Sequence, residues 1–81
     1  MKQEKLFDLF TINNIHFASI RTFQHLKTGN HFEASFQDRI TQFKIVNSGQ
    51  VKNFNNLTLK PNQILLFSDT QPNKFMVIEI C

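Results

Sequence analysis

Short apolar runs, each closed by turn-forming residues, dominate this chain and restrict what it can fold into. The turn signals are Asn13-Asn14, residues 27–30, Ser48-Gly49, Asn55-Asn56 and Pro61-Asn62. Gly and Asn tolerate positive φ, and Pro presets the φ that the first central position of a turn requires. Six or seven short strands at these intervals predict an all-β fold, a small antiparallel barrel or sandwich.

The strand pattern is most regular after residue 30. Residues 31–36 alternate around Phe32, Ala34 and Phe36, which is the period of a strand with one buried face. Residues 64–67 are wholly apolar, which predicts a central strand covered on both faces. Residues 75–80 are apolar on both faces and predict the last strand.

The stretch FKIVNSGQVKNF, residues 43–54, is predicted to be a β-hairpin that turns at Ser48-Gly49. Two earlier segments are less regular. Residues 3–10 fit one or two helical turns or a strand, so the fold class includes a possible short N-terminal helix. Residues 15–26 fit a strand with a bulge or bend, with a helix as the alternative.

Eighty-one residues make a single domain, residues 1–81, near the lower limit for a stable core. The ten Phe residues are unusual because neither Trp nor Tyr is present. Phe buries a large area without needing a hydrogen-bond partner, so most of the ten should lie in the core. The others should form an apolar patch, either a dimer face or a ligand cavity.

Charge and cysteine content limit the class of partner and the cellular compartment that we expect. Nine Lys and Arg against six Asp and Glu give +3, and the basic residues are scattered rather than clustered, which favours solubility over a dedicated nucleic-acid interface. The single Cys81 excludes an internal disulfide framework. With no signal peptide and no apolar run of membrane-spanning length, we expect a cytoplasmic protein.

The order of elements in residues 31–80 resembles the cupin domain at the N-terminus of bacterial AraC-type transcription regulators. Two motifs carry the resemblance: Phe43-Lys44-Ile45-Val46 with Gly49, and Leu57, Leu59 and Pro61 ahead of the apolar run 64–67. The resemblance implies an incomplete, cupin-like barrel that dimerises or binds a small effector. In such regulators a separate helical domain contacts DNA, and no helix-turn-helix pattern fits this chain.

Metal-bearing cupins carry a His-x-His pair and then a Glu before the turn Gly. Those positions fall among residues 35–38 and on Gln42, and none of them is a His or a Glu. Gln is a poor metal ligand. We therefore expect no metal and no cofactor.

Catalytic groupings are also missing from the sequence. The three imidazoles have no familiar ligand spacing, the terminal thiol lacks a neighbouring base, and the nearest carboxylates face opposite sides of an ideal strand. These residues are His16, His25, His31, Cys81, Glu33 and Asp38. We expect that the protein is not an enzyme.

The function that the sequence favours is a non-enzymatic regulatory binding module acting by dimerisation and by binding a small anionic or apolar effector. Phe rings would line the effector cavity and a cation would pair with an acidic group. The candidate residues are Phe17, Arg21, Phe32, Phe43 and Lys44. The competing interpretation places these Phe residues in the core and the cations in solvent. An exposed edge strand, residues 31–36 or 74–80, would supply the dimer contact.

Two other functions stay open. Phe side chains on a sheet with interleaved cations can stack nucleic-acid bases, as the RNA-binding β modules do. The residues concerned are Phe32, Phe36, Phe43, Phe54, Arg39, Lys44 and Lys52. An inhibitor or accessory protein, of phage or host, that docks on a larger protein is the third possibility.

Overall fold

A computed structural model of the chain describes residues 4–52 and 58–81. In this part of the chain the regular structure consists of strands, without an α-helix, and the all-β prediction is confirmed. The strands are β1 (Glu4–Lys5), β2 (Phe7–Ile12), β3 (Ile15–Ile20), β4 (His31–Phe36), β5 (Arg39–Gln50), β6 (Gln63–Ser68) and β7 (Gln71–Ile80).

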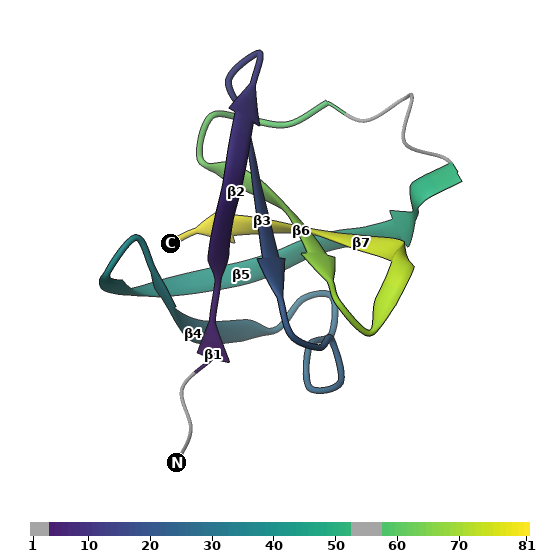
Figure 1. Cartoon of the computed structure of the whole chain (residues 1–81). Helices are drawn as coiled ribbons and strands as arrows, with labels where there is room; N and C mark the ends of the chain where they lie inside the picture. The colour runs from purple at the N-terminus through teal and green to yellow at the C-terminus, as the bar shows by residue number, and fades with distance from the viewer. Residues whose placement is uncertain (1–3, 53–57) are drawn as a thin grey trace.

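All seven strands belong to one sheet in the order β1-β4-β5-β7-β6-β3-β2. β1 and β2 stand at opposite ends of this order, yet only Leu6 separates them in the chain. The sheet therefore curls into a nearly closed barrel (Figure 1). It is mixed rather than purely antiparallel as predicted, because β1 pairs with β4, and β3 with β6, in parallel. The strands of each parallel pair are not consecutive in the chain, so no hairpin turn requires them to be antiparallel.

Two hairpins are closed by two-residue turns with both residues at positive φ. Asn13 and Asn14 (φ 51° and 66°) join β2 to β3, and Gln37 and Asp38 (φ 52° and 63°) join β4 to β5. This is the geometry of type I′ turns, which match the twist of the strands they connect. The predicted turn at Pro61 is also present, where the Gln63 amide donates to the Lys60 carbonyl at 3.0 Å.

The possible N-terminal helix is not formed. Within residues 4–12 the backbone is extended and pairs first with β4 and then with β3, so its hydrogen-bonding groups are used between strands. The predicted strand at 15–26 ends at Ile20. Phe23 and Leu26 are still buried, because the connection after β3 folds back over the core.

The predicted hairpin at Ser48-Gly49 is wrong, since β5 runs straight through both residues. Gly49 lies opposite Phe75 of β7, and a Cβ at Gly49 would come within 2.9 Å of the Phe75 ring. The glycine is therefore explained by the ring that covers it rather than by a turn. Residues 51–52 are not in a strand, and the rest of the predicted partner strand with the Asn55-Asn56 turn lies outside the described residues.

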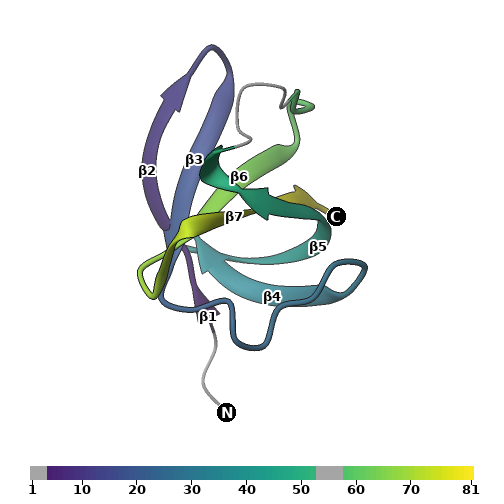
Figure 2. The ribbon, with the colours of Figure 1, turned by 90° about the vertical axis from the view of Figure 1, so that its right-hand side faces the viewer.

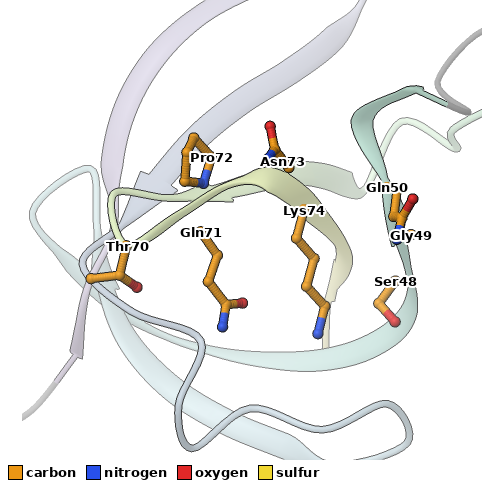
Figure 3. A pocket seen from close by; sticks show the side chains of 8 residues that line it. All are labelled: Ser48, Gly49, Gln50, Thr70, Gln71, Pro72, Asn73 and Lys74. Carbon is orange, nitrogen blue, oxygen red and sulfur yellow. The ribbon is translucent and has the colours of Figure 1, made fainter.

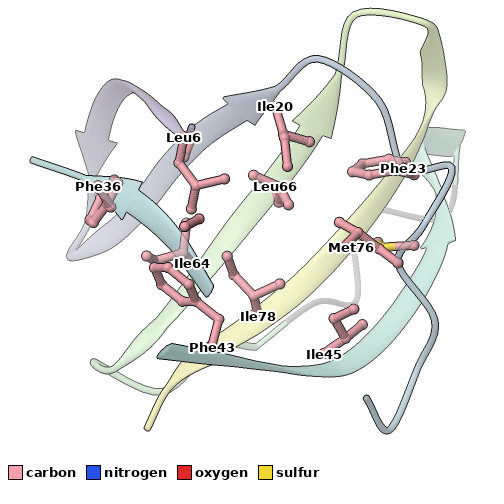
Figure 4. Close-up of a cluster of buried hydrophobic side chains, with 13 residues drawn as sticks. Leu6, Ile20, Phe23, Phe36, Phe43, Ile45, Ile64, Leu66, Met76 and Ile78 are labelled. Atoms are coloured by element: carbon pink, nitrogen blue, oxygen red, sulfur yellow. The ribbon is translucent and has the colours of Figure 1, made fainter. Parts of the chain in front are cut away.

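The apolar side chains form two clusters on the two faces of the sheet. The larger cluster fills the barrel (Figure 4). The smaller cluster lies outside it, where Phe17, Leu65, Phe75 and Val77 are buried. β6 contributes to both clusters, which confirms that it is a strand covered on both faces. Most of the described Phe residues are buried or half-buried, as predicted; Phe7 and Phe10 are the exposed ones.

We expect Gly49→Ala to lower the free energy of unfolding by about 1–3 kcal/mol, because the added methyl overpacks the Phe75 ring. Chemical denaturation followed by circular dichroism measures it. In a Phe75→Leu background the same substitution should cost clearly less. An equal cost in both backgrounds would show that the ring is not the reason for the glycine.

Candidate binding surface

β2 is an edge strand whose six residues are all exposed. Its apolar side chains Phe7, Leu9, Phe10 and Ile12 are 49%, 48%, 50% and 54% exposed. Figure 2 shows β2 as the outermost strand of the sheet, with β3 beside it. Within the described residues β2 pairs with β3 alone, so one edge of its backbone is open to a further strand. We call these four residues and the open edge the β2 surface.

Packing beneath the β2 surface holds part of it in place. The Phe10 ring stacks on Phe17 with the ring centres 4.6 Å apart, and Phe17 lies parallel to Phe67 at 6.3 Å. A shift of register between Asp8 and Phe10 marks a bulge at Leu9. The row of rings gives Phe10 a fixed orientation, so the apolar surface is preformed.

A polar cluster lies next to the β2 surface. His16 Nε2 is 2.6 Å from Asp8 Oδ1, and His16 Nδ1 is 3.2 Å from the Thr11 hydroxyl. Gln37, in the turn between β4 and β5, donates to Asp8 Oδ2 at 3.0 Å. Nε2 finds no hydrogen-bond partner of good geometry, so its contact with Asp8 is chiefly electrostatic.

The hydrogen bond from Gln37, with a further contribution from His16, lowers the pKa of Asp8 below its ordinary value of 3.8. Hydroxyl, imidazole and carboxylate in sequence are the groups of a hydrolytic triad. Here, however, Asp8 and Thr11 are exposed, and none of the three lines either of the two grooves described below. We therefore assign the cluster a structural role, joining the β2–β3 hairpin to the β4–β5 turn.

Two grooves open on the surface of the barrel. The first has a volume of about 550 Å³ and lies between the end of β5 and the start of β7 (Figure 3). In this view Gln71 and Lys74 extend in the same direction, on the side where Ser48 lies. The second groove, of about 720 Å³, lies between the N-terminal strands and the connection that follows β3.

The five residues predicted to bind an effector are not brought together. Phe43 is fully buried inside the barrel and stacks on half-buried Phe32. Phe17 belongs to the opposite face of the sheet. Arg21 and Lys44 are exposed, and of the five only Arg21 lines one of the grooves described. Effector binding stays a prediction, and the two cations are the members of the set that a ligand can reach.

Of the two predicted edge strands, residues 74–80 are wrong, because they belong to β7, which lies between β5 and β6 at the centre of the sheet. Residues 31–36 form β4, which pairs along its whole length with β5. On its other side β4 pairs with the two-residue β1 only at Ala34 and Ser35, so this edge is covered in part. The β2 surface was missed because residues 3–10 also fit a helix. The signal that identifies it is the Asn13-Asn14 turn, with an apolar six-residue strand on each side.

Comparison with protein-family models, with curated proteins and with solved structures found no match to the chain. In the two described stretches, no three His, Cys, Asp or Glu side chains are placed to share a metal ion. Across the same residues, no helix has the length and apolar character that crossing a bilayer demands.

The lowered pKa of Asp8 predicts a small, pH-dependent contribution to stability. The contribution is present above pH 3.8 and is lost as the pH falls through the lowered pKa. At pH 7, Asp8→Asn should reduce the free energy of unfolding by less than about 1 kcal/mol, because the pair is partly exposed and screened. The free energies of unfolding of Asp8→Asn and the wild type should become equal near pH ~2.

Urea denaturation at both pH values measures this difference. Asp38→Asn is the matched control, since it removes the same charge from an exposed turn position that Asn also tolerates. A loss from Asp8→Asn that persists unchanged at the lower pH would contradict the electrostatic origin.

Proposed function

We propose that the protein is a non-enzymatic binding module that self-associates through β2, with β2 of one copy pairing antiparallel to β2 of another. The observation that carries the proposal is the open edge of a strand whose exposed side chains are mostly apolar. Soluble proteins usually protect such an edge with Lys, Pro or a covering segment. The β2 sequence FDLFTI contains neither Lys nor Pro.

The area of the β2 surface suits such a contact. Each of its four apolar side chains is about half exposed. Together they offer roughly 300–400 Å² of apolar area, given the size of these side chains. A standard interface buries about 800 Å² per partner. The side chains alone would supply almost half of that, and the paired backbones and flanking residues would add the rest.

Charge also permits two copies to meet here. Asp8 is the one charged residue in β2, and its carboxylate is engaged by Gln37 and His16. A two-fold pairing is self-complementary, since the same residues face one another from both copies. The apolar side chains would then pack against their counterparts without bringing two free carboxylates together.

A regulatory role of the AraC type and a cytoplasmic location stay predictions from the sequence. The first motif of that resemblance expected a turn at Gly49, where β5 instead continues. The proposal of self-association does not depend on the resemblance, because it is argued from β2, which lies outside residues 31–80.

Light scattering after size-exclusion chromatography tests the proposal. We expect a concentration-dependent species of twice the 9.5 kDa chain mass. Leu9→Lys, which places a cation at the centre of the strand, should weaken dimerisation by about tenfold or more, because each 1.4 kcal/mol lost changes the equilibrium tenfold.

Ile40→Lys is the matched control, because Ile40 is 57% exposed and lies in β5. It should leave the dimer intact, and circular dichroism should show that both variants fold. A wild-type protein that stays monomeric across the accessible concentration range would refute the proposal.

A further inference from the structure

The two grooves meet at Thr70, which lines both of them. One extends from Thr70 along the start of β7 toward Ser48, and the other extends toward Lys5 and Phe7 at the N-terminal strands. Because Thr70 lines both, we treat the two grooves as one surface and call it the Thr70 groove. An extended ligand that crosses Thr70 can contact both parts, whereas a closed pocket admits only a compact ligand.

The Thr70 groove gathers positive charge that is dispersed in the sequence. Lys5 and Arg21 line one part of it and Lys74 lines the other, against one lining carboxylate, Glu4. Within the described residues none of these three cations forms an ion pair with a carboxylate. Unpaired cations along a groove attract a polyanion and give its phosphates several points of contact.

A buried hydroxyl fixes the junction of the groove. Ser68 is 4% exposed, and its Oγ donates to the Arg21 carbonyl oxygen at 3.2 Å. The same oxygen accepts from the Thr70 amide at 3.2 Å and lies 3.0 Å from the Thr70 hydroxyl. The Asp69 amide also donates to the Ile20 carbonyl oxygen at 3.2 Å. These bonds join the residues beside β3 to the β6–β7 turn, so the groove is built on a rigid base.

The Thr70 hydroxyl is a polar group that lines both parts of the groove. A hydroxyl has two acceptor lone pairs, so Thr70 keeps an acceptor for a ligand whichever hydroxyl donates in its contact with Ser68. A ribose 2′-hydroxyl can donate to such an acceptor, and deoxyribose offers no donor at that position.

Phe7 provides the apolar component of the site. It is 49% exposed and lines the groove, with the Lys5 ammonium 5.2 Å from its ring centre. An exposed ring beside cations is the arrangement that stacks a base while the neighbouring charges hold phosphates. Phe7 also belongs to the β2 surface, so a base stacked on its ring and a second copy bound at β2 would compete for this residue.

We propose that the Thr70 groove binds single-stranded RNA. Lys5, Arg21 and Lys74 hold the phosphates, Phe7 stacks a base, and Thr70 accepts from a ribose hydroxyl. The sequence alone favoured scattered charge without an interface. The fold changes that interpretation, because Lys5, Arg21 and Lys74 all line the Thr70 groove. The proposal does not rest on self-association.

Fluorescence anisotropy with a labelled oligouridylate of about a dozen nucleotides tests the proposal. Three phosphate contacts predict a slope of about −2 for log K against log salt concentration. Arg21→Gln with Lys74→Gln should weaken binding about tenfold or more and reduce the magnitude of the slope by about 1.4. Lys44→Gln with Lys60→Gln removes the same charge outside the groove and should change binding less than threefold.

Three outcomes would overturn the proposal. They are the absence of binding by the wild type, equal losses in the two double variants, and competition by uridine monophosphate or inorganic phosphate as effective as that by unlabelled RNA. An oligodeoxyuridylate of the same length, which differs only by the missing 2′-hydroxyls, should bind several-fold more weakly. Equal affinity would show that Thr70 does not accept a hydrogen bond from the ribose. Light scattering on the Arg21 and Lys74 double variant separates this test from self-association. The two substitutions lie outside β2 and should leave the oligomeric state the same as that of the wild type.

Discussion

The hydrogen bond from the Leu6 amide to the Ser35 carbonyl, 2.8 Å long, marks the point at which the N-terminal segment changes partners. Before it, β1 pairs with β4, and after it, β2 pairs with β3. The Leu6 side chain enters the core at the same point and is buried there. One extended segment thereby links the two ends of the sheet, and the curvature of the barrel depends on that link.

The same change of partner explains why β2 is exposed. β1 pairs with β4, whereas β2 pairs with β3 at the other end of the sheet, where no described strand lies beyond it. The segment that links the two ends of the sheet therefore leaves one edge of β2 open. The exposed apolar residues of β2 therefore follow from how the barrel closes, and the apolar sequence of β2 makes them a surface that can bind.

Local chemistry made much of the fold predictable. Asn13-Asn14 and Pro61-Asn62 specify turns by their backbone preferences, and the apolar run at 64–67 specifies a strand covered on both faces. Gly49 led to the wrong prediction of a turn, because a glycine can be required either by a turn or by a side chain that packs closely on the backbone. Only the position of Phe75 across the sheet decides between the two. The parallel pairs were not predictable, since they join segments that no local pattern connects.

The surfaces were less predictable than the strands. Phe17, Phe32 and Phe43 are equally plausible as cavity or core residues until the sheet assigns them to faces, and it assigns them to opposite ones. Likewise, the charge around Thr70 is invisible in the sequence because its members are contributed by different elements. Pattern and propensity describe one strand at a time, whereas a surface is made by the neighbours of each strand.

The position of β7 has a consequence for how the chain acquires its structure. β7 lies at the centre of the sheet, between β5 and β6, although it is formed by residues 71–80. The barrel cannot close before these residues are synthesised. Until then the apolar faces of the preceding strands stay exposed to solvent. Folding is then dominated by contacts distant in sequence, which are slow to form. The hairpins with type I′ turns are the units that can form first and shorten that interval.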